Sequence, residues 1–369
     1  MKLALLLPGF SSDERDWCIP ALLNLVRYLA SNHEVHVFAL RYPPRADRYQ
    51  VFGATVHSLN GVGAAGWRSL ALWARAVRAI ADEHRRGAFD VLHAVWAYEP
   101  GPIAVWAGKQ LKIPVMVRLA GGELARLPEI NYGLQLQPHR RALIGWALKQ
   151  ADVVTAGSEY FVGQAERWIE TECAPLGVDT RLFQEERSGK KEVTVLNVAS
   201  LSPVKDHITL LRAFAIVLHD FPNAKLQIVG QDPEGAGAKL IGLGCELQIE
   251  NAVEFSGDVP HDSLPALYRS ATFCVQSSRH EAQGVTVLEA AACGTPTVGT
   301  AVGILPELIG DEWLAPPGDP TRLAELILRG INRPDDLREI GQSVRAKVEG
   351  ELNVRVCAER FLSLYRRLM

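Results

Sequence analysis

The sequence lacks several features that would assign it to a class at once. Its six cysteines form no close pair and show no metal-ligand spacing, which argues against a disulfide framework and against a zinc site. Scattered thiols of this kind suit a reducing cytoplasm, which is the location we expect. There is no Walker loop, G-x-S-x-G, H-E-x-x-H or CxxC pair either. The sequence therefore predicts no metal and no other cofactor.

Long apolar runs and an excess of one charge are absent as well. No stretch is long enough to span a bilayer. The apolar run in residues 1–9 is short and ends in Pro-Gly without a small-residue cleavage site, so we expect a buried first strand rather than a signal peptide. The net charge of −3 gives no general attraction for nucleic acid and argues against that class of partner.

What the sequence does contain is typical of a folded α/β protein. It is 48% hydrophobic and 22% charged, and at 369 residues two domains are expected. Strand-like runs alternate with helical ones, which is the pattern of a parallel sheet. Strands are expected at 3–7, 34–40, 89–95, 114–119, 151–156, 193–199, 224–230, 253–256 and 272–276, and helices at 19–30, 67–84, 208–220, 264–270 and 354–369. The polar segment 184–191 is typical of a linker.

The segment 276–307 carries the clearest functional pattern. A small-residue loop ending at Gly284 leads into an apolar helix that stops at Gly294. Such a loop offers several backbone N–H groups to an anion, and the helix dipole favours negative charge there. Glu281 precedes the loop and Glu289 lies in the first turns of the helix. Two explanations of Glu289 stay open: a functional carboxylate, or simple compensation of the helix dipole.

This segment resembles the Glu-x7-Glu signature of glycosyltransferase family 4, whose members are retaining enzymes that use nucleotide-sugars. The Cys-Gly-Thr-Pro turn at 293–296 and Pro306-Glu307 match its continuation, and Gly177-Val178-Asp179 with Phe183 resembles the end of the family's first domain. The resemblance implies the GT-B architecture: two Rossmann-like parallel-sheet domains facing each other across a cleft. Residues 1–183 would form the acceptor-side domain, 192–351 the nucleotide-sugar domain, and helix 352–369 would cross back onto the first.

By the same resemblance, Glu281 would hold hydroxyls of the donor sugar and Glu289 the ribose. Lys205 matches the family's phosphate-binding lysine, although a lysine beside a sheet edge is often only solvated. It would stabilise the departing diphosphate together with backbone amides, a role that needs no metal. These amides belong to Gly284, Val285, Thr286 and Val287. Where the family usually carries an arginine, this chain has Ser200, so one of two expected cations is missing.

The first domain offers weaker candidates. Gly9 lies in place of the family's double-glycine loop. Residues 118–123 resemble its His-Gly loop, with Ala120 in place of the histidine, while Gly121 and Gly122 still allow close backbone approach to a sugar. Glu123 either faces the acceptor or begins the next helix. His93 either enters the cleft or is a core histidine.

Other functions remain open at this point. Gly61, Gly63 and Gly66 form a G-x-G-x-x-G before a long helix, which suggests an NAD(P)-dependent dehydrogenase. A nucleotide-sugar-binding protein without turnover is a further alternative. The basic, aromatic stretches 67–86 and 139–149 would suit peripheral contact with the inner face of a membrane, or merely a solvated helix face. The expected partners are a nucleotide-sugar and an unidentified acceptor (lipid, polysaccharide or small molecule). The oligomeric state is not predicted.

Overall fold

The alternation of strands and helices produces two parallel sheets in the computed structural model, which describes residues 1–185 and 193–369. The chain divides into two compact units, each built around one sheet. Unit 1 comprises Met1–Gly177 together with Val354–Met369, and unit 2 comprises Val178–Asn353. Of the predicted linker at 184–191, residues 186–191 lie outside the described residues.

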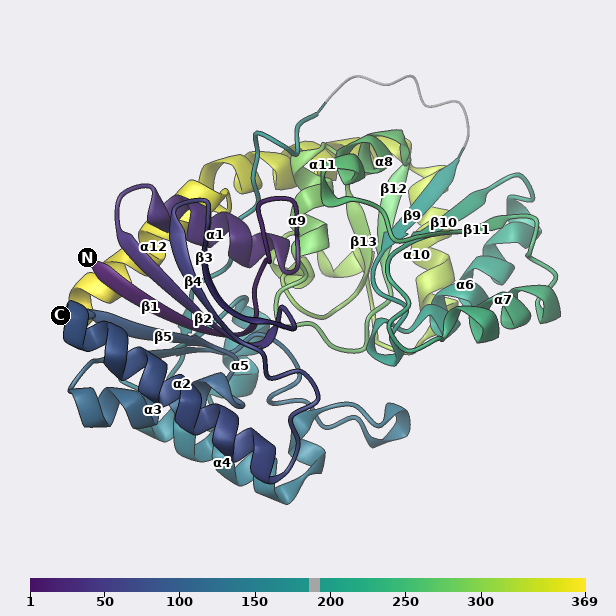
Figure 1. The fold of residues 1–369 in the computed structure, drawn as a ribbon. Helices are drawn as coiled ribbons and strands as arrows, with labels where there is room; N and C mark the ends of the chain where they lie inside the picture. Colours follow the sequence, from purple (N-terminus) through teal and green to yellow (C-terminus); the bar gives the residue numbers. More distant parts are fainter. Residues whose placement is uncertain (186–192) are drawn as a thin grey trace. The chain divides into compact units, whose positions relative to one another are not determined.

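Unit 1 contains a sheet with the strand order β3-β4-β2-β1-β5-β6-β7-β8 (Figure 1). All neighbouring strands pair in parallel except β3 with β4, which are antiparallel. The strands are β1 (Lys2–Gly9), β2 (Glu34–Tyr42), β3 (Ala46–Val51), β4 (Ala54–Leu59), β5 (Val91–Val95), β6 (Val115–Arg118), β7 (Val153–Ala156) and β8 (Glu172–Cys173).

Helices cover both faces of this sheet, which is why its central strands are apolar on both sides. The α-helices are α1 (Pro20–Ala30), α2 (Trp67–Arg86), α3 (Pro100–Leu111), α4 (Pro138–Gln150), α5 (Glu159–Ala165) and α12 (Val354–Leu368), with 3₁₀ turns η1 (Pro128–Ile130) and η2 (Leu134–Leu136). Adjacent residues of β5 show the two sides. Leu92 lies next to Gly108 of α3, whereas His93 contacts Tyr365 of α12. Because neighbouring side chains of a strand point to opposite faces, α3 and α12 cover opposite faces of the sheet.

Unit 2 contains an all-parallel sheet with the strand order β11-β10-β9-β12-β13-β14. Its strands are β9 (Thr194–Val198), β10 (Lys225–Val229), β11 (Val253–Gly257), β12 (Phe273–Gln276), β13 (Thr297–Thr300) and β14 (Leu314–Ala315). Its α-helices are α6 (His207–Asp220), α7 (Gly237–Glu246), α8 (Leu264–Ser270), α9 (Val285–Ala292), α10 (Pro320–Asn332) and α11 (Pro334–Glu351). The 3₁₀ turns are η3 (Pro203–Lys205), η4 (His261–Ser263), η5 (Leu305–Glu307) and η6 (Asp311–Trp313).

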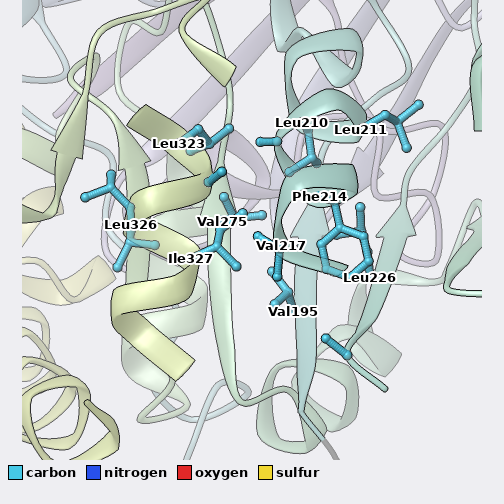
Figure 2. Close-up of a cluster of buried hydrophobic side chains, with 14 of the residues drawn as sticks. Val195, Leu210, Leu211, Phe214, Val217, Leu226, Val275, Leu323, Leu326 and Ile327 are labelled. Atoms are coloured by element: carbon cyan, nitrogen blue, oxygen red, sulfur yellow. The ribbon is translucent and has the colours of Figure 1, made fainter. Parts of the chain in front are cut away.

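A single apolar cluster holds one face of the unit 2 sheet to its helices. Figure 2 shows side chains of α6 and α10 meeting those of β9, β10 and β12. Phe214, Leu326 and Val195 are each fully buried there. A buried aliphatic or aromatic side chain contributes about 1.5–3 kcal/mol relative to an exposed one, so this cluster fixes the strand ends from which the site loops leave.

The predicted strands and helices all correspond to elements of the structure, with ends shifted by a few residues. The hairpin β3–β4, the short strands β8 and β14, and helices α3, α5, α7, α10 and α11 were not predicted. Within the described residues, none of the helices combines the length and the apolar character needed to cross a membrane.

Candidate active site

The candidate site lies between β9 and β12, where the order in which the chain adds strands to the unit 2 sheet reverses. The chain enters this sheet at β9, proceeds outward to β10 and β11, and then returns to the other side of β9 to form β12. The loops after β9 and β12 therefore leave the carboxyl ends of neighbouring strands toward opposite faces. This is the point at which doubly wound sheets bind ligands. A small cavity at this edge is lined by residues of β9, of the loop after β12 and of α9, among them Asn197, Ser278 and Thr286.

The loop after β9 carries the predicted Ser200 and Lys205. Ser200 is half-buried, with its Oγ 3.3 Å from the Oγ of Ser202. Lys205 ends the 3₁₀ turn η3, immediately before Asp206, the N-cap of α6. Asp206 has a left-handed backbone (φ 50°), and its carboxylate accepts hydrogen bonds from the N–H (3.3 Å) and Oγ1 (2.7 Å) of Thr209. This N-cap fixes the start of α6 and, with it, the position of Lys205.

The loop after β12 leads to the start of α9. Gly284 precedes the helix with φ 88°, a conformation that a side-chain-bearing residue rarely adopts. Gly303 packs so closely against this loop that a Cβ there would lie 2.6 Å from the carbonyl oxygen of Gln283. Val285 and Thr286 are half-buried and form the first turn together with buried Val287, and that turn contains no acidic residue. The N–H of Val287 donates to the carbonyl of Gly284 at 3.1 Å, so this predicted amide is already bonded within the turn. The helix entrance otherwise presents its earlier backbone N–H groups and a positive dipole end without a carboxylate of its own.

Lys205 and Glu281 meet between the two loops. The Nζ of Lys205 forms an ion pair and a hydrogen bond with Oε1 of Glu281, and the Oγ of Ser278 donates to the same oxygen at 2.8 Å. The loops are also joined through the backbone, since the N–H of Arg279 donates to the carbonyl of Val204 at 2.8 Å. Two residues 76 positions apart in sequence therefore form one charged pair beside the start of α9.

A second ion pair, which sequence reasoning missed, lies next to the first. The Nε of Arg279 is 2.8 Å from Oδ2 of Asp206. Asp206 is buried, so the guanidinium of Arg279 compensates a carboxylate that water reaches poorly. In the sequence, Asp206 directly follows Lys205, and Arg279 precedes Glu281 by two positions. Each loop therefore carries one acid and one base, and this could have suggested that the two loops form ion pairs with each other.

Glu289 is buried and bonded within unit 2. Its carboxylate accepts a hydrogen bond from Nε2 of His261 at 2.9 Å and another from the hydroxyl of Tyr268 at 3.0 Å. Burial, and then the charge of Glu289, raise the pKa of the Tyr268 phenol. The ring of Phe183 packs edge-on against both partners. Its centroid lies 5.1 Å from the ring centroid of His261 and 6.0 Å from that of Tyr268. These neighbours are distant in sequence and could not be identified from it, and the predicted role of Glu289 toward a ribose stays a prediction.

In unit 1 the predicted glycines lie at the carboxyl ends of β1 and β6. Gly9 ends β1, and a Cβ there would lie 2.9 Å from the Cβ of Tyr42. Gly121 and Gly122 follow β6 and are half-buried, and a Cβ on Gly122 would meet the hydroxyl of Tyr132 at 3.0 Å. Close packing within unit 1 therefore already explains Gly9 and Gly122, and a ligand is not needed to account for them.

His93 is a core histidine, one of its two predicted alternatives, whereas Glu123 matches neither of the positions predicted for it. Glu123 is fully buried and does not begin a helix. Its carboxylate accepts N–H groups of Ala97 (3.2 Å), Ala120 (3.1 Å) and Gly121 (2.6 Å) and so ties two loops together, while burial raises its pKa. The Nδ1 of His93 lies 2.7 Å from the hydroxyl of Tyr365 in the core, where burial lowers its pKa to about 3. Neither side chain faces an open edge, which removes the basis for both acceptor-side predictions.

The G-x-G-x-x-G segment has a structural explanation. It follows β4, the third parallel strand in chain order, and not the first strand of the sheet. Gly63 (φ 69°) and Gly66 (φ 55°) have left-handed backbones, and a Cβ on either would meet nothing within 4 Å. The guanidinium of Arg41 binds the carbonyls of Gly61 and Ala64, both at 3.0 Å. The glycines serve the turn, so the dehydrogenase alternative loses its support.

One cluster in the described part of the chain has the spacing of a metal site: His36, His57 and Glu83 in unit 1. The Nδ1 of His36 lies 2.9 Å from the Nε2 of His57, so the two rings already share a hydrogen bond. Glu83 is paired with Arg86, and the guanidinium of Arg48 is 3.6 Å from its carboxylate. With two cations beside its only carboxylate, the cluster is a buried polar network rather than a cation site.

Comparison with known families covers most of the chain. The family described as "Glycosyl transferases group 1" matches residues 178–347, and the "Glycosyl transferase 4-like domain" matches residues 19–172. The chain is a family 4-type glycosyltransferase. The predicted family is thereby confirmed, while the roles of the Glu-x7-Glu residues and the retaining mechanism stay predictions. Glycosyl transfer replaces the dehydrogenase alternative.

Individual relatives agree with this assignment. The chain is 26% identical over 305 residues to N-acetyl-alpha-D-glucosaminyl L-malate synthase of Bacillus anthracis, covering 78% of this chain and 77% of that protein. It is 28% identical over 311 residues to MMP alpha-(1->4)-mannosyltransferase of Mycolicibacterium hassiacum, covering 79% and 74%.

Solved structures confirm the predicted GT-B fold of this glycosyltransferase. Sucrose-phosphate synthase of Thermosynechococcus elongatus superposes with a TM-score of 0.83 at 22% identity, covering 100% of this chain and 99% of that one. Anabaena HepE, solved in complex with UDP-glucose, superposes with a TM-score of 0.78 at 18% identity over 100% of both chains. At these identities the likeness concerns the fold alone.

Proposed function

We propose that this glycosyltransferase transfers a sugar from a nucleoside-diphosphate sugar to an acceptor, with retention of the anomeric configuration and without a metal. The observation that carries the proposal is the Lys205–Glu281 ion pair. It lies beside the start of α9, at the carboxyl ends of β9 and β12, where the strand order of the unit 2 sheet reverses. A cation and a row of backbone N–H groups suit a diphosphate, and a carboxylate suits sugar hydroxyls.

In the proposed reaction, the bond between the anomeric carbon and the diphosphate oxygen breaks as a bond to the acceptor oxygen forms on the same face of the sugar. The acceptor's proton passes to the leaving phosphate oxygen. Lys205 and the first turn of α9 stabilise the negative charge that grows on the diphosphate. Glu281 holds donor-sugar hydroxyls and favours the geometry of the transition state. No protein side chain acts as a covalent nucleophile.

The donor is proposed by analogy with relatives. HepE was solved with UDP-glucose, and the Bacillus anthracis relative is named for an N-acetylglucosaminyl product of malate. Glu289, held by His261 and Tyr268, keeps unshared lone pairs that two ribose hydroxyls would occupy. The same proposal places the enzyme in the cytoplasm, in peripheral contact with the inner face of a membrane.

A panel of nucleotide-sugars tests the proposal. We expect one diphosphate sugar to bind and to be consumed slowly by water or by an acceptor pool, with product detected by mass spectrometry. Proton NMR of the new linkage then gives the anomeric configuration, and activity should persist in EDTA. An inverted product or loss of activity in EDTA would contradict the mechanism.

The same experiment decides the remaining alternative, a binding protein without turnover. Ser200 and Ala120 replace two side chains that the family usually carries, and this favours weak catalysis. Diphosphate binding with no consumption of any donor, in the presence of an acceptor pool, would establish the silent protein.

A further inference from the structure

Helices α2, α3 and α4 lie side by side on one face of the unit 1 sheet (Figure 1). α3 packs between the other two and rests on β1, β5 and β6. In each helix one side is buried toward the sheet and the opposite side is open. In α2 the buried positions are Leu72, Ala76, Ile80 and Glu83. At 100° per residue, Trp67, Leu70 and Arg78 lie on the opposite side. We call the joint outer surface of the three helices the outer helical face.

The outer helical face exposes large apolar side chains that a solvated surface does not require. Trp67 is 73% exposed, Leu70 64%, Trp106 of α3 58% and Trp146 of α4 40%. The Nζ of Lys109 lies 5.8 Å from the ring centre of Trp146, so exposed groups of α3 and α4 stand next to each other. Tryptophan is the residue most suited to a membrane–water interface, because its ring is apolar and its N–H is polar.

The charge on the outer helical face is predominantly positive. Neither α3 nor α4, all of whose residues are described, contains Asp or Glu, and α2 has none before Asp82, which is paired with Arg85. The exposed cations of this face are Arg68, Arg75, Arg78, Lys109, Lys112 and Lys149. Arg141 is exposed too, but its guanidinium lies over the ring of Trp168, to the side of α4. The whole chain is slightly acidic, so this separation of charge is local. Basic residues around exposed tryptophans match an anionic bilayer surface, which attracts each cation and accepts the rings.

We infer that the outer helical face is a docking surface for an anionic membrane. This inference deepens the proposed function by naming the residues and the lipid charge that give peripheral contact, and it rests on that proposal only for its biological setting. No segment inserts across the bilayer. The tryptophan rings and Leu70 enter the headgroup region while the cations face anionic headgroups. An acceptor carried by a lipid would then be met at this surface.

Vesicle co-sedimentation tests the inference with the full chain and no sugar donor. The probe is vesicles of about three parts phosphatidylcholine to one part phosphatidylglycerol, against phosphatidylcholine alone. We expect binding to the mixed vesicles that weakens with added salt, and little binding to the neutral ones. Lys109→Glu/Lys149→Glu should lower the partition coefficient about tenfold or more, and Trp67→Ala/Trp106→Ala should lower it at every salt concentration.

The matched control is Arg355→Glu/Arg360→Glu, an equal change of net charge at exposed positions of α12, on the opposite face of the sheet. This variant should retain binding. Failure of the wild-type protein to bind mixed vesicles, or an equal loss in the control, would overturn the inference. Binding of a model single-stranded RNA at the same residues instead of vesicles would also overturn it. Because no donor is present, a negative result leaves the proposed transfer reaction intact.

Discussion

Lys205 and Glu281 form an ion pair, so substituting either residue leaves the charge of the other without this partner. Their side chains are only 24% and 14% exposed, so an unpaired charge here is incompletely hydrated. In the proposed reaction, the donor phosphate would lie between Lys205 and the helix entrance while its sugar approaches Glu281. The resting pair orients both side chains in advance, and this would lower the reorganisation that donor binding requires.

The two signature glutamates are expected to separate functionally. Glu289→Ala should weaken binding of the free nucleoside diphosphate, since its carboxylate is held rigid by His261 and Tyr268. Glu281→Gln should leave diphosphate affinity nearly unchanged while turnover falls, because its contribution is made mainly in the transition state. Calorimetry and steady-state kinetics measure both. Glu254→Gln, at an exposed position of β11, serves as the control. Equal losses of diphosphate affinity in both variants would refute the assignment.

Lys205→Ala should lower turnover strongly, because Ser200 supplies no second cation to this loop. An oxyanion donor in a desolvated site contributes about 2.7–4 kcal/mol, or 10²–10³ in kcat. Lys205→Arg should rescue activity only in part, since a planar fork does not replace a compact ammonium. Ser200→Arg should tighten diphosphate binding.

The ion pair also predicts non-additivity. Adding Glu281→Gln to Lys205→Ala should cost less than the sum of the single effects, because the two side chains interact directly. Near-normal kcat in Lys205→Ala would show that another group, with Arg279 the nearest candidate, carries the phosphate charge.

At the scale of elements, the start of α6 depends on one carboxylate. Asp206→Ala removes the cap of α6 and the partner of Arg279, and it should destabilise unit 2 by about 0.5–2 kcal/mol from the cap alone. Asp206→Asn keeps the capping oxygen and should restore most of that stability without restoring the charge. Thermal unfolding followed with and without nucleoside diphosphate measures both effects. An Asn variant as unstable as the Ala variant would show that the ion pair, and not the cap, holds the loop.

The elements that could be predicted from the sequence are those whose buried positions form a regular local pattern. Residues 3–7 are continuously apolar because helices cover both sheet faces, and α2 shows its buried positions at helical spacing. Some of the unpredicted elements break those patterns, whereas α10 does not: its Asp319 cap and the buried positions Leu323 and Ile327 follow helical spacing and were a readable signal. α3 begins Pro-Gly-Pro, α7 contains three glycines, and β3 is polar because it is an edge strand. In each of these, tertiary packing decides the structure against local propensity.

The same distinction holds within the site. The Glu281-to-Glu289 segment and Lys205 were predictable because loop, glycine and helix signals are local, and neighbouring strands bring the two loops together. The partners of Glu289 were not, because His261 and Tyr268 lie on η4 and α8 and meet Glu289 only through packing. The sequence left two alternatives open for Glu123 and two for His93, because burial decides the role of a polar residue and sequence position at a strand end does not reveal it.

At the scale of the whole molecule, buried neutral histidines make stability depend on pH. Burial lowers the pKa of His93 to about 3, and of His57 and His207 to about 4, against 6.5 as the ordinary value. Between about pH 6.5 and 4 the unfolded chain therefore binds more protons than the folded one. Stability should be complete above about pH 6.5 and fall on acidification, by up to about 1.4 kcal/mol per pH unit for each histidine.

Denaturant unfolding at a series of pH values tests this dependence. His93→Gln should reduce the loss of unfolding free energy of unit 1 as the pH falls below 6.5. His139→Gln, at an exposed position of α4, should leave that loss unchanged. A stability that does not change between pH 7 and pH 5 would contradict the neutral, buried state of these side chains.

The antiparallel strand β3 affects how the protein behaves in concentrated solution. A parallel sheet that ended in an apolar strand would offer its free edge to another molecule, and chains would join edge to edge. At this border the chain places the exposed residues Ala46, Asp47 and Arg48, and Oδ1 of Asp47 accepts the backbone N–H of Arg48 at 2.8 Å. A donor that would otherwise recruit a foreign strand is thus occupied locally. Two charged residues on a short hairpin therefore favour colloidal stability over aggregation.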